Sequence, residues 1–450
     1  MNGSALKILK LSLSAFRGIR GRIDIDLSSP LTLIYATNGT GKTSFIDAAE
    51  WILTDEIKRM GRFSKKGAHE ELRCKFSPEE TKTEVRARVE LNDIRYDLCK
   101  TPIRWLLENG DARYTTKDAI LKALAPEAVD GTTDFRTAQT MRKSWIRGTR
   151  FLTEGDLSIL AGTDPEIRGE RRRILFDLMG IRELEHRANG FRKFVGFLNN
   201  GFNGEKGILV IEKELAEKER MLEDSLAEEM SIEQGGSATE AKLLESLRKK
   251  EIDSLRGDIS SLRQRLAGLK SVRKDAESAV AALNERSRSY CRLERDRIAD
   301  VMFSIFGRIH ANENFDLLRE GSEDDPFEWV AMTAKQDLIP SREFSLGQRQ
   351  DLALSVFLAK ARGVGGTFFL DEPMIRLDDL NRVALLDMFR VLVGEENSKV
   401  RLVITTASRT LVRHFQEKFI NVPDIDSVPS LGVVELEGSP RDGVKVIKRV

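Results

Sequence analysis

The fold is decided by one stretch, Ala36-Thr37-Asn38-Gly39-Thr40-Gly41-Lys42-Thr43. It follows the apolar run 31–35 and precedes the amphipathic segment 44–53, so the order is strand, glycine-rich turn and helix. Gly39 and Gly41 allow a tight turn in which backbone N–H groups and the helix N-terminus converge on a phosphate. The sequence therefore predicts a phosphate-binding loop, in which Ala36 replaces the first glycine of the G-x-x-x-x-G-K-[ST] pattern.

A second apolar run, 366–370, ends in two carboxylates, Asp371 and Glu372. A phosphate loop needs such a partner, because one carboxylate orients Mg²⁺ and the other can polarise the attacking water. Lys42 is expected to reach the phosphates, and Thr43 offers a hydroxyl to the metal. These residues predict a site for nucleotide phosphates and Mg²⁺ whose catalytic residue is Glu372. The loop residues predicted to bind nucleotide are Asn38, Gly39, Thr40, Gly41, Lys42, Thr43 and Ser44.

Length and composition set the class of protein. A chain of 450 residues exceeds one ordinary core, and its 32% of charged residues indicates an extended, solvated helical part. Three scattered cysteines, Cys74, Cys99 and Cys291, favour a reducing compartment and no structural zinc. The start of the chain lacks a signal-peptide core, and no run of eighteen apolar residues occurs. We expect a cytoplasmic protein without a membrane segment.

The remaining pattern around the loop is that of an α/β domain. Alternating apolar residues predict two strands within 6–27, a hairpin at 85–98, and buried or terminal strands at 402–406, 433–436 and 444–447. Two helices are predicted, at about 117–125 and 134–144.

From about residue 182 the chain becomes helical and charged, with a narrow apolar seam. The seam spacing alternates between three and four residues, as in a heptad repeat. Its clearest positions are Ile252, Leu255, Ile259, Leu262, Leu266 and Leu269. An earlier apolar run includes Leu215 and Leu222, and the segment 234–238 between the two runs can reverse the chain. We expect an antiparallel coiled-coil hairpin in preference to two independent surface helices.

Net charge gives no argument for nucleic acid, since 73 lysines and arginines balance 72 acidic residues. A basic loop follows the first helix, and it is either a solvated face or a contact for DNA phosphates. The DNA candidates are Lys58, Arg59, Arg62, Lys65 and Lys66. A second basic group consists of Arg142, Lys143, Arg147 and Arg150.

Further motifs carry a resemblance to a known family. Ser345-Leu346-Gly347-Gln348 resembles the signature motif of ABC-type ATPases, and 377–381 resembles their D-loop. Ala15-Phe16-Arg17-Gly18 resembles the start of SMC and SbcC-type heads, and 165–181 resembles the segment that enters their coil. The chain is thus similar to an SMC- or SbcC-like head over nearly its whole length outside the coil apex. Residues 371–381 look most like the SMC-like subunit of Lamassu-type anti-phage systems.

The resemblance implies an α/β fold: a P-loop ABC-type ATPase head with a mixed sheet, helices, an antiparallel β element and an inserted antiparallel coiled-coil hairpin. The expected domains are the N-terminal half of the head (1–181), the hairpin (182–300, apex near 234–238) and the C-terminal half of the head (301–450). Gly235-Gly236-Ser237 resembles an engineered linker, so the coil is either trimmed or naturally short. No cysteine lies near the apex, which excludes a zinc hook.

The same resemblance implies a homodimer whose two heads sandwich two ATP molecules. Arg17 would lie near the nucleotide of its own subunit, and Glu154 would occupy the position of the Q-loop glutamine. The implied metal ligands are Thr43, Asp371 and Glu154. The residues implied to contact ATP across the dimer are Ser345, Gly347, Gln348 and Asp378. Double-stranded DNA, a separate effector nuclease and accessory subunits are the expected partners.

One departure from the family concerns the switch histidine, whose place after strand 402–406 is taken by Ala407. Slow hydrolysis is therefore expected. The chain's histidines are expected to be structural or superficial: His69, His186, His310 and His414. An SbcC-like repair ATPase is the alternative to a defence protein. The coil insertion argues against a transporter or translation-factor ATPase.

Overall fold

The computed structural model describes residues 5–60, 68–128, 135–232, 238–310, 315–318, 329–333, 335–375, 377, 379–395, 398–420, 422, 424 and 428–449. The chain forms two compact units, one made of 1–183 with 290–450 and the other of 184–289. The second unit is shorter than the predicted insertion at 182–300, because the end of the last coil helix packs with the first unit. No helix of the described ranges is long and apolar enough to cross a bilayer.

A six-stranded mixed sheet organises the first unit, in the order β15-β14-β3-β13-β12-β8. Five strands run parallel: β3 (Leu31–Ala36), β8 (Phe151–Leu152), β12 (Gly366–Asp371), β13 (Val400–Thr406) and β14 (Leu431–Ser439). β15 (Gly443–Arg449) is antiparallel to β14. The predicted buried and terminal strands are confirmed.

Helices cover both faces of this sheet. They are α1 (Lys42–Thr54), α4 (Phe135–Arg150), α5 (Glu154–Ala161), α6 (Arg168–Met179), α10 (Leu346–Val364), α11 (Asp379–Gly394) and α12 (Arg409–Phe419). Short 3₁₀ turns occur at Lys58–Met60, Pro126–Ala128, Pro165–Ile167 and Ser341–Glu343. The predicted helix at 134–144 continues as α4 to Arg150.

An antiparallel sheet packs beside α1, in the order β2-β1-β4-β5-β6-β7. Its strands are β1 (Lys7–Phe16), β2 (Ile19–Asp26), β4 (Glu84–Leu91), β5 (Ile94–Lys100), β6 (Trp105–Glu108) and β7 (Arg113–Tyr114). The predicted hairpin turns at Asn92 and Asp93, both with positive φ, as a tight two-residue hairpin requires. Helices α2 (Ala68–Leu72) and α3 (Lys117–Leu124) complete this part.

The alternation of side chains along the central strands separates two cores. Phe368 and Leu370 point into a core with α10, α11, α12 and the end of α9 (Ala238–Ile309), whereas Phe369 points into a core with α1 and the antiparallel sheet. Strands that are buried on both faces appear in the sequence as continuous apolar runs, which is why the sequence predicted them. A separate three-stranded sheet contains β9 (Phe315–Leu318), β10 (Val330–Thr333) and β11 (Leu338–Pro340).

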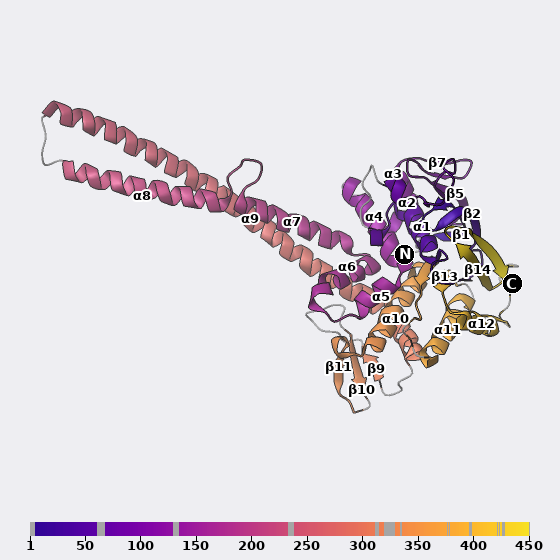
Figure 1. Ribbon diagram of the computed structural model, residues 1–450. Helices are drawn as coiled ribbons and strands as arrows, with labels where there is room; N and C mark the ends of the chain where they lie inside the picture. Colours follow the sequence, from indigo (N-terminus) through magenta and orange to yellow (C-terminus); the bar gives the residue numbers. More distant parts are fainter. Residues whose placement is uncertain are drawn as a thin grey trace. The chain divides into compact units, whose positions relative to one another are not determined.

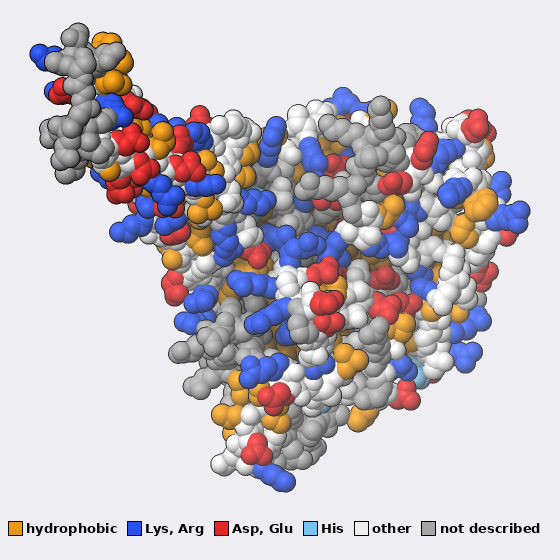
Figure 2. Space-filling view, turned by 60° about the vertical axis from the view of Figure 1, so that its left-hand side comes forward, with side chains coloured by type: hydrophobic (Ala, Val, Ile, Leu, Met, Phe, Trp, Pro, Cys, Tyr) orange, Lys and Arg blue, Asp and Glu red, His pale blue; other side chains and the backbone are white. Residues whose placement is uncertain are grey.

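The second unit is the hairpin, built from α7 (Arg182–Asn200), α8 (Ile208–Ile232) and α9 (Ala238–Ile309). Helices α8 and α9 lie side by side (Figure 1), and Ile208 and Ile211 bury against Leu266. Ion pairs such as Lys218 with Asp258 flank this apolar seam, and acidic and basic side chains alternate over the hairpin surface (Figure 2). The coiled-coil prediction is confirmed; the apex, 233–237, lies outside the described residues.

A very close helix contact in the head is the crossing of α4 and α6 at Gly148. A Cβ built on Gly148 would lie 2.4 Å from the backbone carbon of Asp177. The lack of space therefore requires glycine at this position. Backbone conformation does not, since the φ of Gly148 is not in the left-handed region.

We predict that Gly148→Ala lowers the free energy of unfolding by about 1–3 kcal/mol, the usual cost of overpacking. Urea titration followed by circular dichroism measures this change. The matched control is Gly169→Ala in α6, where nothing lies within 4 Å of the added Cβ. The control should change stability by less than about 1 kcal/mol and in the stabilising direction. Equal stabilities for the two variants would contradict the packing argument.

Candidate nucleotide site

The glycine-rich turn that the sequence predicts to be a phosphate loop lies between β3 and α1. Gly39 and Gly41 adopt φ values of 84° and 105°, which favour glycine because a Cβ is strained there. A side chain at Gly41 would also meet Ile19 at 2.8 Å. Ala36 has an ordinary backbone, and its carbonyl accepts a 2.6 Å hydrogen bond from Lys42 Nζ. The alanine is thus compatible with a closed loop, since the position needs no positive φ.

The loop lies at the carboxyl edge of the sheet together with the two carboxylates. Lys42 Nζ lies 3.4 Å from Glu372 Oε1. Thr405 Oγ1, at the end of the neighbouring strand, donates to Asp371 Oδ1 at 2.5 Å and accepts from the Glu372 backbone N–H at 3.2 Å. Burial raises the pKa of Asp371 and of Glu372, and Lys42 opposes the rise at Glu372. Lys42, Asp371 and Glu372 therefore form one charged cluster.

Arg17 lies against the same loop. The N–H of the next residue, Gly18, donates to Ser44 Oγ at 3.1 Å. Arg17 Nε lies 2.9 Å from Asp47 Oδ2, and Arg59 Nε donates to Asp47 Oδ1 at 2.7 Å. Asp47 thus holds two guanidinium groups at the first turns of α1.

A second acidic residue of α1, Glu50, begins a buried ion-pair network. Arg147 Nε lies 2.8 Å from Glu50, and Arg147 Nη2 lies 2.7 Å from Asp156 Oδ2. Lys58 completes the network: its Nζ donates to Asp156 Oδ1 at 2.7 Å, and its backbone N–H donates to Glu50 at 3.0 Å. Burial alone would raise the pKa of Asp156, but Arg147 and Lys58 outweigh it and hold that pKa below its ordinary range.

The network positions Glu154. Asp156 accepts from the backbone N–H and the hydroxyl of Thr153, and so caps α5, of which Glu154 is the first residue. Leu152 pairs with Leu370 in the parallel ladder. Both strands therefore leave the sheet at the same level, and Glu154 follows β8 as Glu372 follows β12.

The signature residues form the start of α10. Ser345 is the N-cap: its Oγ accepts from the Gln348 N–H at 3.2 Å, and Gln348 Oε1 accepts from the Ser345 N–H at 2.8 Å. Ser345 is exposed and Gly347 is half-buried, so the helix N-terminus is accessible to an anionic ligand. In the described part of the chain, no hydrogen bond or ion pair joins Ser345 to the phosphate loop of the same chain. Asp378 lies outside the described residues.

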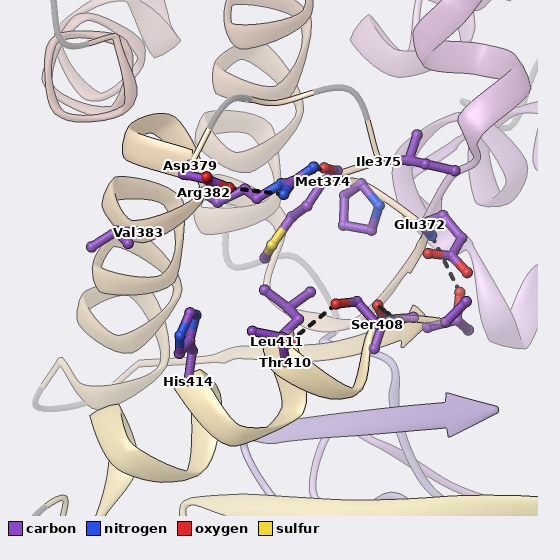
Figure 3. A pocket seen from close by; sticks show the side chains of 14 residues that line it. Glu372, Met374, Ile375, Asp379, Arg382, Val383, Ser408, Thr410, Leu411 and His414 are labelled. Atoms are coloured by element: carbon purple, nitrogen blue, oxygen red, sulfur yellow. Dashed lines mark hydrogen bonds and ion pairs between the residues drawn. The ribbon is translucent and has the colours of Figure 1, made fainter. Parts of the chain in front are cut away.

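A pocket of about 570 Å³ opens beside Glu372, between α11 and α12. Ala407 and Ser408 line it where the switch histidine was expected, and Ser408 caps α12. His414 lines the same pocket, but Figure 3 shows it at the opposite end from Glu372, with Leu411 and Met374 between them. His414 therefore does not replace the missing histidine. His186 is exposed, and His310 contacts Asp351.

Two of the five basic residues predicted to contact DNA form ion pairs within the head. Lys58 and Arg59 are engaged with Asp156 and Asp47, and the side chain of Lys58 is only 23% exposed. Arg62, Lys65 and Lys66 lie outside the described residues. The second basic group is wrong as a DNA surface, because all four side chains of α4 are largely buried: Arg142, Lys143, Arg147 and Arg150.

The oxygen donors at this edge fit Mg²⁺. Asp371 presents a carboxylate, and the exposed Thr43 presents a hydroxyl at the start of α1. Mg²⁺ takes one or two such protein ligands and completes its octahedron with waters and phosphate oxygens. Glu154 begins α5 directly after β8, and within the described ranges no three His, Cys, Asp or Glu side chains are grouped so that they could hold a metal ion by themselves. The assignment of Thr43, Asp371 and Glu154 as metal ligands stays a prediction.

Sequence reasoning missed Asp47, Glu50 and Asp156, and it assigned Arg147 to a basic surface group instead of to this network. Asp47 and Glu50 were visible as two acidic residues, three positions apart, in the mostly apolar segment 45–53, every residue of which is buried. Carboxylates at such positions are normally paired, and that signal could have identified them.

Comparisons with known proteins agree with this architecture. A family model described as AAA domain, AAA_23, matches residues 10–267, which is more than half of the chain. A segment of 101 residues is 34% identical to the SbcC component of the nuclease SbcCD from Vibrio cholerae serotype O1. That segment covers 22% of this chain and 10% of the relative, so the chain matches only a small part of it.

Solved structures with a similar fold are heads of Smc proteins. A Pyrococcus furiosus Smc head domain, with an extended coiled coil and bound to the C-terminal domain of ScpA, has a TM-score of 0.50 and 18% identity over 99% of this chain and 96% of that chain. A Pyrococcus yayanosii Smc head domain with a coiled coil and joint has a TM-score of 0.51 and 16% identity over 99% and 97%. The predicted fold class is thereby confirmed.

We predict that Asp156→Asn lowers the free energy of unfolding by about 3 kcal/mol, because it removes the carboxylate shared by the largely buried Arg147 and the partly buried Lys58. Since the native pKa of Asp156 lies below its ordinary value, the stabilisation is complete above about pH 4 and is lost only on further acidification. Urea titrations at about pH 5 and pH 8 should therefore give the same difference. The control, Asp164→Asn at an exposed site, should change stability by less than about 0.5 kcal/mol. A difference that vanishes at the lower pH would contradict this account.

Proposed function

Since the chain belongs to the AAA_23 family of AAA domains, we propose that it is an SMC- and SbcC-like ATPase that hydrolyses ATP between two heads. The observation that carries this proposal is the 3.4 Å separation of Lys42 Nζ and Glu372 Oε1 at the carboxyl edge of the sheet. It places the phosphate-binding cation beside a carboxylate that can act on water.

In this proposal the loop amides, Lys42 and Arg17 bind the phosphates. Thr43, Asp371 and Glu154 would hold Mg²⁺, which supplies charge neutralisation at the phosphate oxygens. Glu372 orients and deprotonates the attacking water, and its buried surroundings favour that role because a raised pKa makes a carboxylate a better base.

The second half of the site comes from another copy of the chain. Ser345 and Gly347 present an exposed helix N-terminus, whose amide groups and dipole favour a γ-phosphate. Asp378 of the D-loop would face the same nucleotide. ATP is then a ligand that selects the closed dimer, and hydrolysis releases it.

The first test uses Glu372→Gln, which keeps the shape of the side chain but removes the base. The variant should bind Mg-ATP and accumulate as a dimer, with kcat at least about 100-fold lower, as loss of a general base predicts. Light scattering after size-exclusion chromatography, with and without Mg-ATP, measures the dimer. Turnover at the wild-type rate would remove Glu372 from this role.

The matched variant is Ser345→Arg in the Glu372→Gln background. A cation of this size at the N-cap should block dimerisation while leaving the ATP affinity of the monomer within about twofold, since the serine acts on the partner's nucleotide. A large fall in the affinity of the monomer would contradict the assignment across the dimer.

For the wider setting, we propose control of DNA binding or sensing, in a bacterial anti-phage complex with a separate effector nuclease. The resemblance of 371–381 to Lamassu-type subunits supports defence, and the match to the SbcC component of the nuclease SbcCD supports the alternative, a repair ATPase with a nuclease partner. Both settings imply a cytoplasmic protein with accessory subunits. Affinity purification from the native host, with identification of the co-purifying nuclease, distinguishes the defence setting from the repair setting.

The DNA proposal now depends on Arg62, Lys65 and Lys66. Replacing all three with glutamate should weaken duplex binding in Mg-ATP about equally for all sequences and flatten its salt dependence, because phosphate contacts carry no sequence information. Fluorescence anisotropy across a salt series measures both effects. The control is the triple glutamate variant of Arg88, Arg95 and Arg113, which are exposed on the antiparallel sheet. An equal loss in the control would contradict the assignment of the loop.

A further inference from the structure

A buried carboxylate in the signature helix joins the ends of two other helices. Asp351 of α10 is fully buried. Its Oδ2 accepts from His310 Nδ1 at 3.3 Å and from Asn381 Nδ2 at 3.2 Å. His310 directly follows α9, and Asn381 lies in the first turn of α11. One oxygen atom therefore connects the residue that follows the long coil helix, the signature helix and the D-loop helix.

The apolar surroundings of Asp351 make a buried carboxylate unfavourable unless it accepts hydrogen bonds. Asp351 lies in a helix whose neighbouring residues, among them Leu352 and Leu354, belong to the same apolar core as Phe306 and Leu385. A carboxylate buried among apolar side chains loses its hydration, and only well-placed donors offset that loss. These two hydrogen bonds are sensitive to movement of the helices, because a displacement of about 1 Å takes either donor beyond hydrogen-bond distance.

His310 is held rigidly at its end of the contact. Its ring stacks on Phe306 at 5.1 Å between centroids, and its backbone N–H donates to the Phe306 carbonyl at 2.8 Å. The backbone carbonyl of Asp351 accepts from Ser355 Oγ at 2.6 Å, and this bond stabilises the turn of α10 that carries the carboxylate. A rotation of the end of α9 would therefore act directly on the oxygen that also holds Asn381.

We propose that Asp351 is a positioning residue that couples the end of α9 to the half of the ATP site offered to the partner. This inference rests on the proposed function, because Ser345 and the D-loop meet a nucleotide only in an ATP-bound dimer. Asp351 lies six residues after Ser345, about 9 Å along the helix, and Asn381 follows Asp378 by three. The carboxylate thus fixes the spacing between the signature N-terminus and the D-loop according to the position of α9.

The test compares two substitutions of His310 in the full-length Glu372→Gln chain. His310→Phe keeps the ring on Phe306 but removes the donor, whereas His310→Asn supplies an amide N–H near the position of Nδ1. Dimerisation in Mg-ATP is measured by light scattering, and the affinity of the monomer is measured with a fluorescent ATP analogue. Amide hydrogen exchange without nucleotide is followed over 346–352 and 379–385, with α1 as the internal reference.

The expected result is a dimer about tenfold weaker for His310→Phe, with the ATP affinity of the monomer within twofold and with recovery to within threefold for His310→Asn. Exchange over 379–385 should become faster in His310→Phe, and His310→Asn should restore it. An unchanged dimer, or an equal fall in the ATP affinity of the monomer, would overturn the inference. If the parent Glu372→Gln chain itself fails to dimerise, the proposed function fails, and unchanged exchange over 379–385 would separately refute the coupling.

Discussion

The parallel register of the central sheet is the constraint on which the site depends. Ile404 is the register partner of both Leu33 and Leu370, and Leu370 also pairs with Leu152. Segments from residue 31 to residue 406 therefore end at one edge, because the carboxyl ends of parallel strands lie together. A slip of one residue in β12 would move Phe369 into the opposite core and turn Asp371 away from Thr405.

Apolar packing alone would not fix the helices around that edge to hydrogen-bond precision. The buried charges do so, because an ion pair has a defined distance and direction, whereas apolar contacts tolerate sliding. Asp47 holds Arg17 and Arg59, and Asp156 holds Arg147 and Lys58. The phosphate-loop helix, the loop after it and the helix that begins with Glu154 are thereby tied to one another.

The parts of the fold that the sequence predicted are those whose signal is local. A strand buried on both faces, a glycine-rich turn and a heptad seam each occupy one short window, and the structure has all three. The basic residues of α4 were misjudged because a charged side chain on a helix normally faces water; Arg150 instead lies buried with its guanidinium 4.9 Å from the Phe368 ring centroid. Contacts such as Asp351 with Asn381 join residues 30 apart, and periodicity gives no signal for them.

The pairing of Lys42 with Glu372 suggests how the proposed reaction is ordered. Phosphate oxygens on the loop compete for the same ammonium, and a triphosphate carries more charge than one carboxylate. When Lys42 turns to the phosphates, Glu372 loses the charge that opposes the rise of its pKa. Its affinity for a proton then increases, so complete seating of the nucleotide strengthens the base that acts on the attacking water. Because Ala407 offers no imidazole to share that task, the rate of the proposed reaction would depend on this carboxylate and on closure of the partner's helix N-terminus over the phosphate.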